Sequence, residues 1–164
     1  SGDRPFPALS SEQPATLSRY LKLGGTLIID PAYTVDGDVA GFMKSTDSLI
    51  RDIAPGAQET PIQSDHVIFR SFYRLTRAVG RVKGPEGLSG WGIDSRMAVI
   101  RTDHDLAGAF ARDNLGNWEY SVEPGGERQR ENAFRLGINL VLYTLCQDYK
   151  NEQPHRRFSP SGGP

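Results

Sequence analysis

The sequence predicts an α/β domain with at least one buried parallel strand. A short apolar run rich in β-branched residues, at residues 26–30, follows a predicted helix that ends at Gly24. A long helix predicted over residues 127–150 is apolar on two faces, which indicates burial on more than one side. With 164 residues, the chain is long enough to bury a core of its own. We expect a single domain over residues 3–150 and an extended C-terminal tail over residues 151–164.

The first half of the chain alternates helical and extended patterns. Ser10 or Ser11 can cap the first helix, Gly24 is a natural residue to end it, and Pro31 stops the strand that follows. Periodic apolar residues then predict a second helix. In order, we predict a helix over residues 10–23, a strand over 26–30, a helix over 41–53 and a short strand over 59–63.

The second half contains a glycine-rich stretch and one further strand. Five glycines surround Pro85 in residues 80–92, so this segment is predicted to be a long loop that carries Trp91. Around it we predict a helical turn and an extended segment over residues 66–75, a strand over 95–102, a short helical turn over 105–111 and the helix over 127–150.

Charge and motifs exclude several classes of function. There are 19 basic and 20 acidic residues, a net charge of −1, so no general field attracts nucleic acid or anionic lipid. No apolar run approaches the length of a transmembrane segment. The single cysteine, Cys146, lies inside a predicted buried helix, and no Gly-x-Ser-x-Gly turn is present. Histidine spacing matches no metal motif, so we expect neither a nucleophile nor a metal or cofactor.

Asp30 stands at the carboxyl end of the first predicted strand. Ligands of open α/β sheets usually bind at that end of the strands. The alternative is that Asp30 only caps the following turn, and the pattern leaves both open.

Residues 64–75 mix large apolar side chains with many polar ones, and this stretch supplies three residues of a candidate site. Polar groups of this density need partners or face a cleft. Arg70, Arg96 and His66 would receive an anionic or polar group, and Tyr73 and Trp91 would form the wall. The full candidate set is Asp30, His66, Arg70, Tyr73, Trp91, Asp94 and Arg96.

Structural explanations compete with this candidate site. Arg70 would pair with a carboxylate such as Asp94 to pin the long loop, and His66 would cap a turn. Asn139, an amide within a buried helix, must bond something, and the backbone of a nearby loop is the simplest partner.

Four blocks in this order resemble a bacterial family of domains of unknown function, number 4159. They are Ser11-Glu12 to a strand ending in Asp30; His66-x-Ile68-Phe69-x-Ser71-Phe72-Tyr73-x-Leu75; Gly92-Ile93-Asp94-Ser95-Arg96; and Leu136-Gly137-Ile138-Asn139 through Tyr149-Lys150. The resemblance implies a flavodoxin-like, three-layer domain with a mainly parallel sheet, similar to class I glutamine amidotransferases. It also implies a periplasmic or membrane-associated protein with partners of the von Willebrand A-type or MoxR-type ATPase systems. It implies no reaction.

Two functions follow from these observations. The first is a non-catalytic module that binds a ligand or a protein or supports assembly, because a polar cluster is present without a nucleophile. The alternative is a hydrolase or transferase in which His66 is the general base and Asp30 orients it or binds a metal. In a purely structural domain, the same residues would be buried and fully paired.

Overall fold

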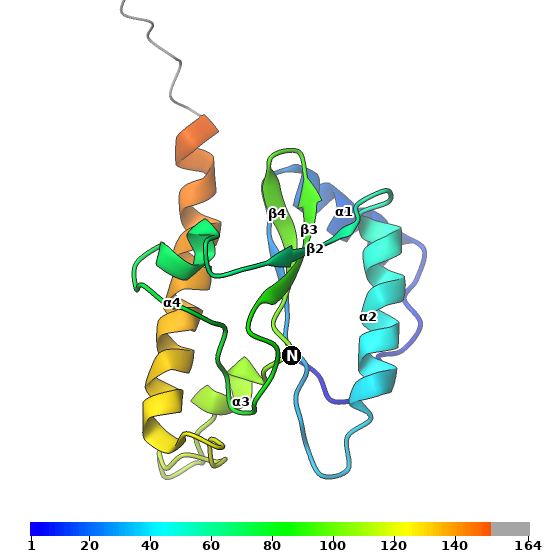
Figure 1. The fold of residues 1–164 in the computed structure, drawn as a ribbon. Coiled ribbons are helices and arrows are strands. Elements are labelled where there is room, and N and C mark those ends of the chain that lie inside the picture. The colour runs from blue at the N-terminus through cyan, green and yellow to red at the C-terminus, as the bar shows by residue number, and fades with distance from the viewer. Residues whose placement is uncertain (152–164) are drawn as a thin grey trace, which may run out of the picture.

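The protein, described in a computed structural model over residues 1–151, is a small mixed sheet with helices on both faces (Figure 1). The strands are β1 (Leu27–Ile29), β2 (Glu59–Ile62), β3 (Leu88–Ile93) and β4 (Arg96–Arg101). The α-helices are α1 (Glu12–Lys22), α2 (Val39–Ile53), α3 (Leu106–Phe110) and α4 (Gly126–Asn151), and one 3-10 helix, η1, spans Val67–Arg70.

The α/β class is confirmed, but the predicted sheet is wrong. The strand order is β1-β4-β3-β2, and only β1 and β4 run parallel. The β2–β3 and β3–β4 pairs are antiparallel. A small mixed sheet of this kind is not the mainly parallel sheet of a flavodoxin-like domain.

The physical reason for this error lies in the glycine-rich stretch. Residues 88–93 form strand β3 instead of a loop, and Trp91 is buried within it. At Gly90 the strand packs closely against its neighbours, because a Cβ there would lie 2.6 Å from Ile62 Cδ1. A tight turn at Asp94, whose φ is 55°, then reverses the chain into β4. Hairpin pairing makes most of the sheet antiparallel.

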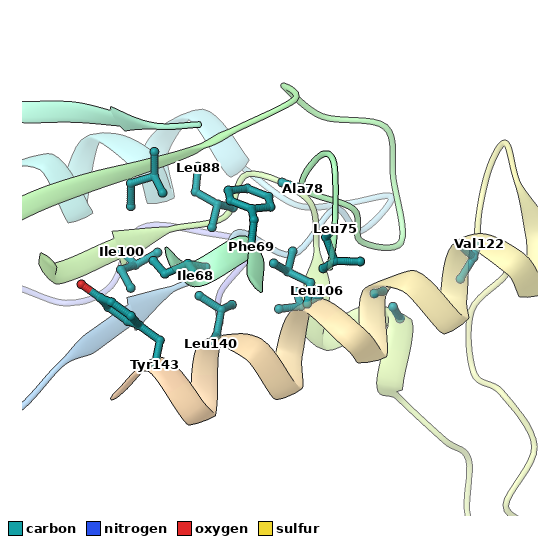
Figure 2. Close-up of a cluster of buried hydrophobic side chains, with 14 residues drawn as sticks. Ile68, Phe69, Leu75, Ala78, Leu88, Ile100, Leu106, Val122, Leu140 and Tyr143 are labelled. Atoms are coloured by element: carbon teal, nitrogen blue, oxygen red, sulfur yellow. The ribbon is translucent and has the colours of Figure 1, made fainter. Parts of the chain in front are cut away.

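Each face of the sheet has its own apolar core. Leu21 of α1 and Ile50 and Ile53 of α2 pack with Val99 and Trp91 on one face. The other face is covered by α4, α3 and η1. Figure 2 shows Ile68 and Phe69 of η1 between the sheet and α4, close to Ile100 and Leu140.

Several predicted boundaries are confirmed within about two residues. Gly24 ends the first helix with a φ of 102°, which glycine adopts without strain. The second helix begins earlier than expected because the Asp38 carboxylate accepts a hydrogen bond from Gly41 N at 2.9 Å. Within residues 1–151, no helix is both long and apolar enough to cross a bilayer. The predicted C-terminal tail lies outside the described residues except for Asn151, which ends α4.

Candidate functional site

The Asp30 carboxylate is fully engaged at the end of β1. It is 5% exposed and accepts hydrogen bonds from the backbone N–H groups of Leu106 and Ala107, both at 2.8 Å. The hydroxyl of Thr102 donates a third hydrogen bond. Asp30 therefore joins the end of β1 to the start of α3 and to the residue after β4. Asp30 does not cap the turn that follows it, as the alternative had it, but binds the first N–H groups of a helix 76 residues further along the chain.

His66 is placed at the start of η1. Its Nδ1 accepts a hydrogen bond from Ile68 N at 3.3 Å, and its ring meets the edge of Tyr143 at a centroid distance of 5.7 Å. Burial lowers the pKa of His66, and the charge of Arg70 lowers it further, whereas Asp65 raises it. Among the described residues no hydrogen bond joins His66 to Asp30, so the geometry gives the proposed general-base pair no support.

Arg70, Asp94 and Tyr73 do not come together at one site. Arg70 is exposed and makes no ion pair with any described side chain, and Asp94 lies in the exposed β3–β4 turn. The ring of Tyr73 packs edge-on against Phe72, and the Arg135 guanidinium lies 5.4 Å above it. The pairing of Arg70 with Asp94 is therefore absent from the described structure.

Arg96 and Trp91 have structural partners on the other face of the sheet. Arg96 donates hydrogen bonds to the carbonyl oxygens of Leu21 and Gly25, the latter at 2.9 Å, and so binds the carboxyl end of α1. The Arg101 guanidinium stacks 5.0 Å above the ring of Trp91. Trp91 also borders a cavity of about 520 Å³ beside α2.

Asn139 holds the middle segment of the chain against α4. Its Oδ1 accepts hydrogen bonds from Phe72 N at 3.1 Å and Tyr73 N at 2.8 Å. Its Nδ2 donates to the carbonyl oxygen of Tyr73 at 2.8 Å. The amide is completely buried, and its predicted bonding to loop backbone is confirmed.

A larger cavity of about 890 Å³ lies between the segment after η1 and the first turns of α4. Its lining includes Arg74, Arg77, Lys83 and Arg128, and its only carboxylate is Glu86. We call this the basic cavity. All four cations are exposed, and none pairs with a carboxylate among the described side chains. The cavity thus carries a local charge of +3 in a chain of net charge −1, whereas the lining of the cavity beside Trp91 has two carboxylates and one cation.

The frame of the basic cavity is fixed by hydrogen bonds. Gln129 Nε2 donates to the carbonyl oxygens of Gly80 and Glu123, both at 2.8 Å, and Ala78 N donates to the carbonyl oxygen of Glu86 at 2.7 Å. These bonds tie the glycine-rich loop to α4 and to itself. The cations therefore project from a backbone frame that internal hydrogen bonds hold in place.

His104 forms the buried floor of the basic cavity. It is 1% exposed, and a Cβ on Gly84 would lie 2.7 Å from its Cδ2, so the loop wraps it closely. Its Nδ1 contacts the carbonyl oxygen of Thr102, and its Nε2 lies 2.7 Å from that of Pro85. Because both ring nitrogens face backbone oxygens, His104 presents no free nitrogen to a substrate. The cavity lining includes no cysteine or serine.

A family model described as a domain of unknown function (DUF4159) matches residues 1–145. The chain belongs to the DUF4159 family. The resemblance that the four blocks indicated is thus confirmed at the level of the family. No curated protein matches the chain.

The basic cavity of this DUF4159 domain was missed by sequence reasoning. Arg74, Arg77 and Lys83 lie within ten residues of one another, next to the stretch already singled out, and this local basic density was the available signal. The near-zero net charge of the whole chain obscured it. Arg128 joins them only through the fold.

The buried His104 and the half-buried His66 predict that the DUF4159 domain loses stability in acid. Burial lowers the pKa of His104 below 6.5, although the Pro85 carbonyl and the charges of Asp103 and Asp30 oppose this shift. The unfolded chain therefore binds protons at a higher pH than the folded one, so the histidine contribution is complete above about pH 6.5 and is lost as the pH falls through the folded pKa.

This pH dependence can be measured by urea unfolding at pH 7.5 and pH 5.5. We expect the free energy of unfolding to fall with pH, each histidine contributing a slope of at most about 1.4 kcal/mol per pH unit. His104→Gln should reduce the slope even if it also lowers stability at both pH values. His66→Gln should reduce it as well, since burial lowers that pKa too. Slopes identical in the native protein and both variants would contradict the prediction.

Proposed function

We propose that this domain is a non-catalytic binding module that receives an anionic ligand in the basic cavity. The observation that carries the proposal is the collection of four cations without ion-pair partners and one carboxylate in a single cavity. Elsewhere in the described structure, the buried or half-buried arginines have internal partners: Arg81 pairs with the Asp105 carboxylate, and Arg96 bonds backbone carbonyl oxygens. Cations without internal partners in a concave site are available to an anion.

Three features support binding without chemistry. The floor histidine has both nitrogens against carbonyl oxygens, and the only carboxylate in the lining, Glu86, lies among cations. A nucleophile within reach of a general base is the usual signature of covalent catalysis, and no hydrogen bond joins Thr76, the one hydroxyl of this lining, to His104 or Glu86. His66 lines neither this cavity nor the smaller one beside Trp91, so the hydrolase or transferase alternative gains no support.

Protein partners stay a prediction of the family resemblance. An assembly role with von Willebrand A-type or MoxR-type ATPase systems is compatible with an anion-binding module, since an acidic group of a partner would meet the same cations. The residues first expected to bind are replaced in this proposal by Arg74, Arg77, Lys83 and Arg128.

The proposal predicts that anions stabilise the protein through the basic cavity. At constant ionic strength, sulfate, citrate or pyrophosphate should raise the melting temperature relative to chloride. A ligand at about 100 times its Kd contributes about 2.7 kcal/mol, which is about 5 °C or more for a domain of this size. The double variant Arg74→Ala/Arg77→Ala should abolish the shift, because it removes two of the four cations.

The matched control is Arg19→Ala/Lys44→Ala, which removes two exposed cations from α1 and α2 on the opposite face of the sheet. This variant should keep the full shift. If none of the three anions stabilises the native protein, or if the two double variants respond equally, the proposed function is wrong.

A further inference from the structure

The cations of the basic cavity come from three separate segments of the chain. Arg74 and Arg77 follow η1, Lys83 lies in the glycine-rich loop, and Arg128 is in the first turn of α4. Positive charge therefore meets the cavity from more than one side. A ligand that neutralises it must present several anionic oxygens in different directions.

The charge balance sets a lower limit on the valence of the ligand. Four cations and one carboxylate leave +3, so a monoanion would leave most of that charge uncompensated. Three of the four cations are arginines, whose planar guanidinium forms paired hydrogen bonds with oxyanions. A carboxylate offers two oxygens in one plane and a single charge, whereas a phosphoryl group offers three oxygens and up to two charges.

The size and lining of the cavity favour a small molecule over a macromolecular surface. A volume of about 890 Å³ falls in the range of small-molecule sites. Part of the wall between the cations is apolar, formed by Leu75, Val79, Val82 and Pro85. Protein interfaces are instead extended patches of about 800 Å² per partner.

We infer that the basic cavity binds a small molecule that carries two or more phosphoryl groups. This inference rests on the proposed function and narrows its ligand class. Thr76 and Asn132 also line the cavity and provide neutral hydrogen-bonding groups beside the cations. Either an inorganic polyphosphate or an organic diphosphate would satisfy the same contacts, the latter placing its organic part against the apolar wall.

The test is a valence series titrated into the full chain by calorimetry at constant pH and ionic strength. The probes are orthophosphate, pyrophosphate, tripolyphosphate and a nucleoside diphosphate, with citrate as a carboxylate control of charge comparable to pyrophosphate. We expect affinity to rise at least tenfold from orthophosphate to pyrophosphate and to be at least tenfold weaker for citrate than for pyrophosphate. Tighter binding of the nucleoside diphosphate than of pyrophosphate identifies the organic form, and equal or weaker binding identifies the inorganic one.

Variants locate the binding and separate the two proposals. Arg128→Ala and Arg74→Ala should each weaken pyrophosphate about tenfold, whereas Arg19→Ala on α1 should leave it unchanged. Citrate binding as tightly as pyrophosphate, or a single-stranded oligonucleotide binding more tightly than tripolyphosphate, would overturn the ligand class while leaving an anion-binding module. Failure of every anion to bind would overturn the proposed function itself.

Discussion

Replacing Asp30 by alanine is expected to lower the free energy of unfolding by about 4 kcal/mol. The carboxylate is buried and accepts hydrogen bonds from Leu106 N, Ala107 N and the Thr102 hydroxyl. Alanine removes all three bonds and leaves polar groups unpaired away from water, which costs more than the bonds themselves contribute. Urea unfolding followed by circular dichroism measures the loss.

The size of the loss distinguishes an anchor from an ordinary cap. Asp38→Ala removes the exposed cap of α2 and should cost only about 1 kcal/mol. Asp30→Asn keeps one acceptor oxygen but turns an amide N–H₂ toward donors. Its loss of stability should therefore lie between those of Asp38→Ala and Asp30→Ala. A loss below about 1 kcal/mol for Asp30→Ala would contradict the assigned role. Loss of pyrophosphate affinity in Asp30→Asn protein that is still fully folded would instead assign Asp30 to the ligand.

Replacing Asn139 by leucine is expected to cost about 3 kcal/mol of stability. Leucine has nearly the same shape, so the change leaves little cavity and isolates the polar contribution. The substitution removes the hydrogen-bond partner of the N–H groups of Phe72 and Tyr73 and of the carbonyl oxygen of Tyr73, which all bond the amide in the native protein. The measurement is again urea unfolding, with near-ultraviolet circular dichroism to report the packing of the aromatic segment.

Asn132→Leu is the matched control, since Asn132 is on the same helix and its side chain makes no hydrogen bond with any described group. It should change stability by less than about 0.5 kcal/mol. Asn139→Asp retains the acceptor and loses the donor, so its free energy of unfolding should lie between those of the native protein and Asn139→Leu. Equal losses of stability in Asn132→Leu and Asn139→Leu would show that the hydrogen bonds of the Asn139 amide contribute nothing specific to stability.

The elements that were predicted well depend on local chemistry. The strand that ends at Asp30, the helix that ends at Gly24 and the short helical turn near residue 106 follow from apolar runs and capping residues close in sequence. The bonding of Asn139 to loop backbone was also predicted correctly, because a buried amide must find hydrogen-bond partners whatever the topology.

The errors depend on contacts between distant segments. Strand β3 was read as a loop because its glycines serve close packing against Ile62 and Met97, which no local pattern reveals. Arg96 was expected to bind a ligand, but it bonds carbonyl groups 71 and 75 residues away. The basic cavity needs Arg128 beside Arg74, and only the fold brings them together.

The separation between the cations of the basic cavity and the bonds that fix its frame has an evolutionary consequence. Arg74, Arg77, Lys83 and Arg128 form no internal ion pair among the described side chains, so exchanging them carries little penalty for folding. Gln129 and Asn139, by contrast, hold the scaffold and tolerate little change. Under the proposed function, ligand preference is thus free to diversify among related domains at four surface positions, without any redesign of the architecture that presents them.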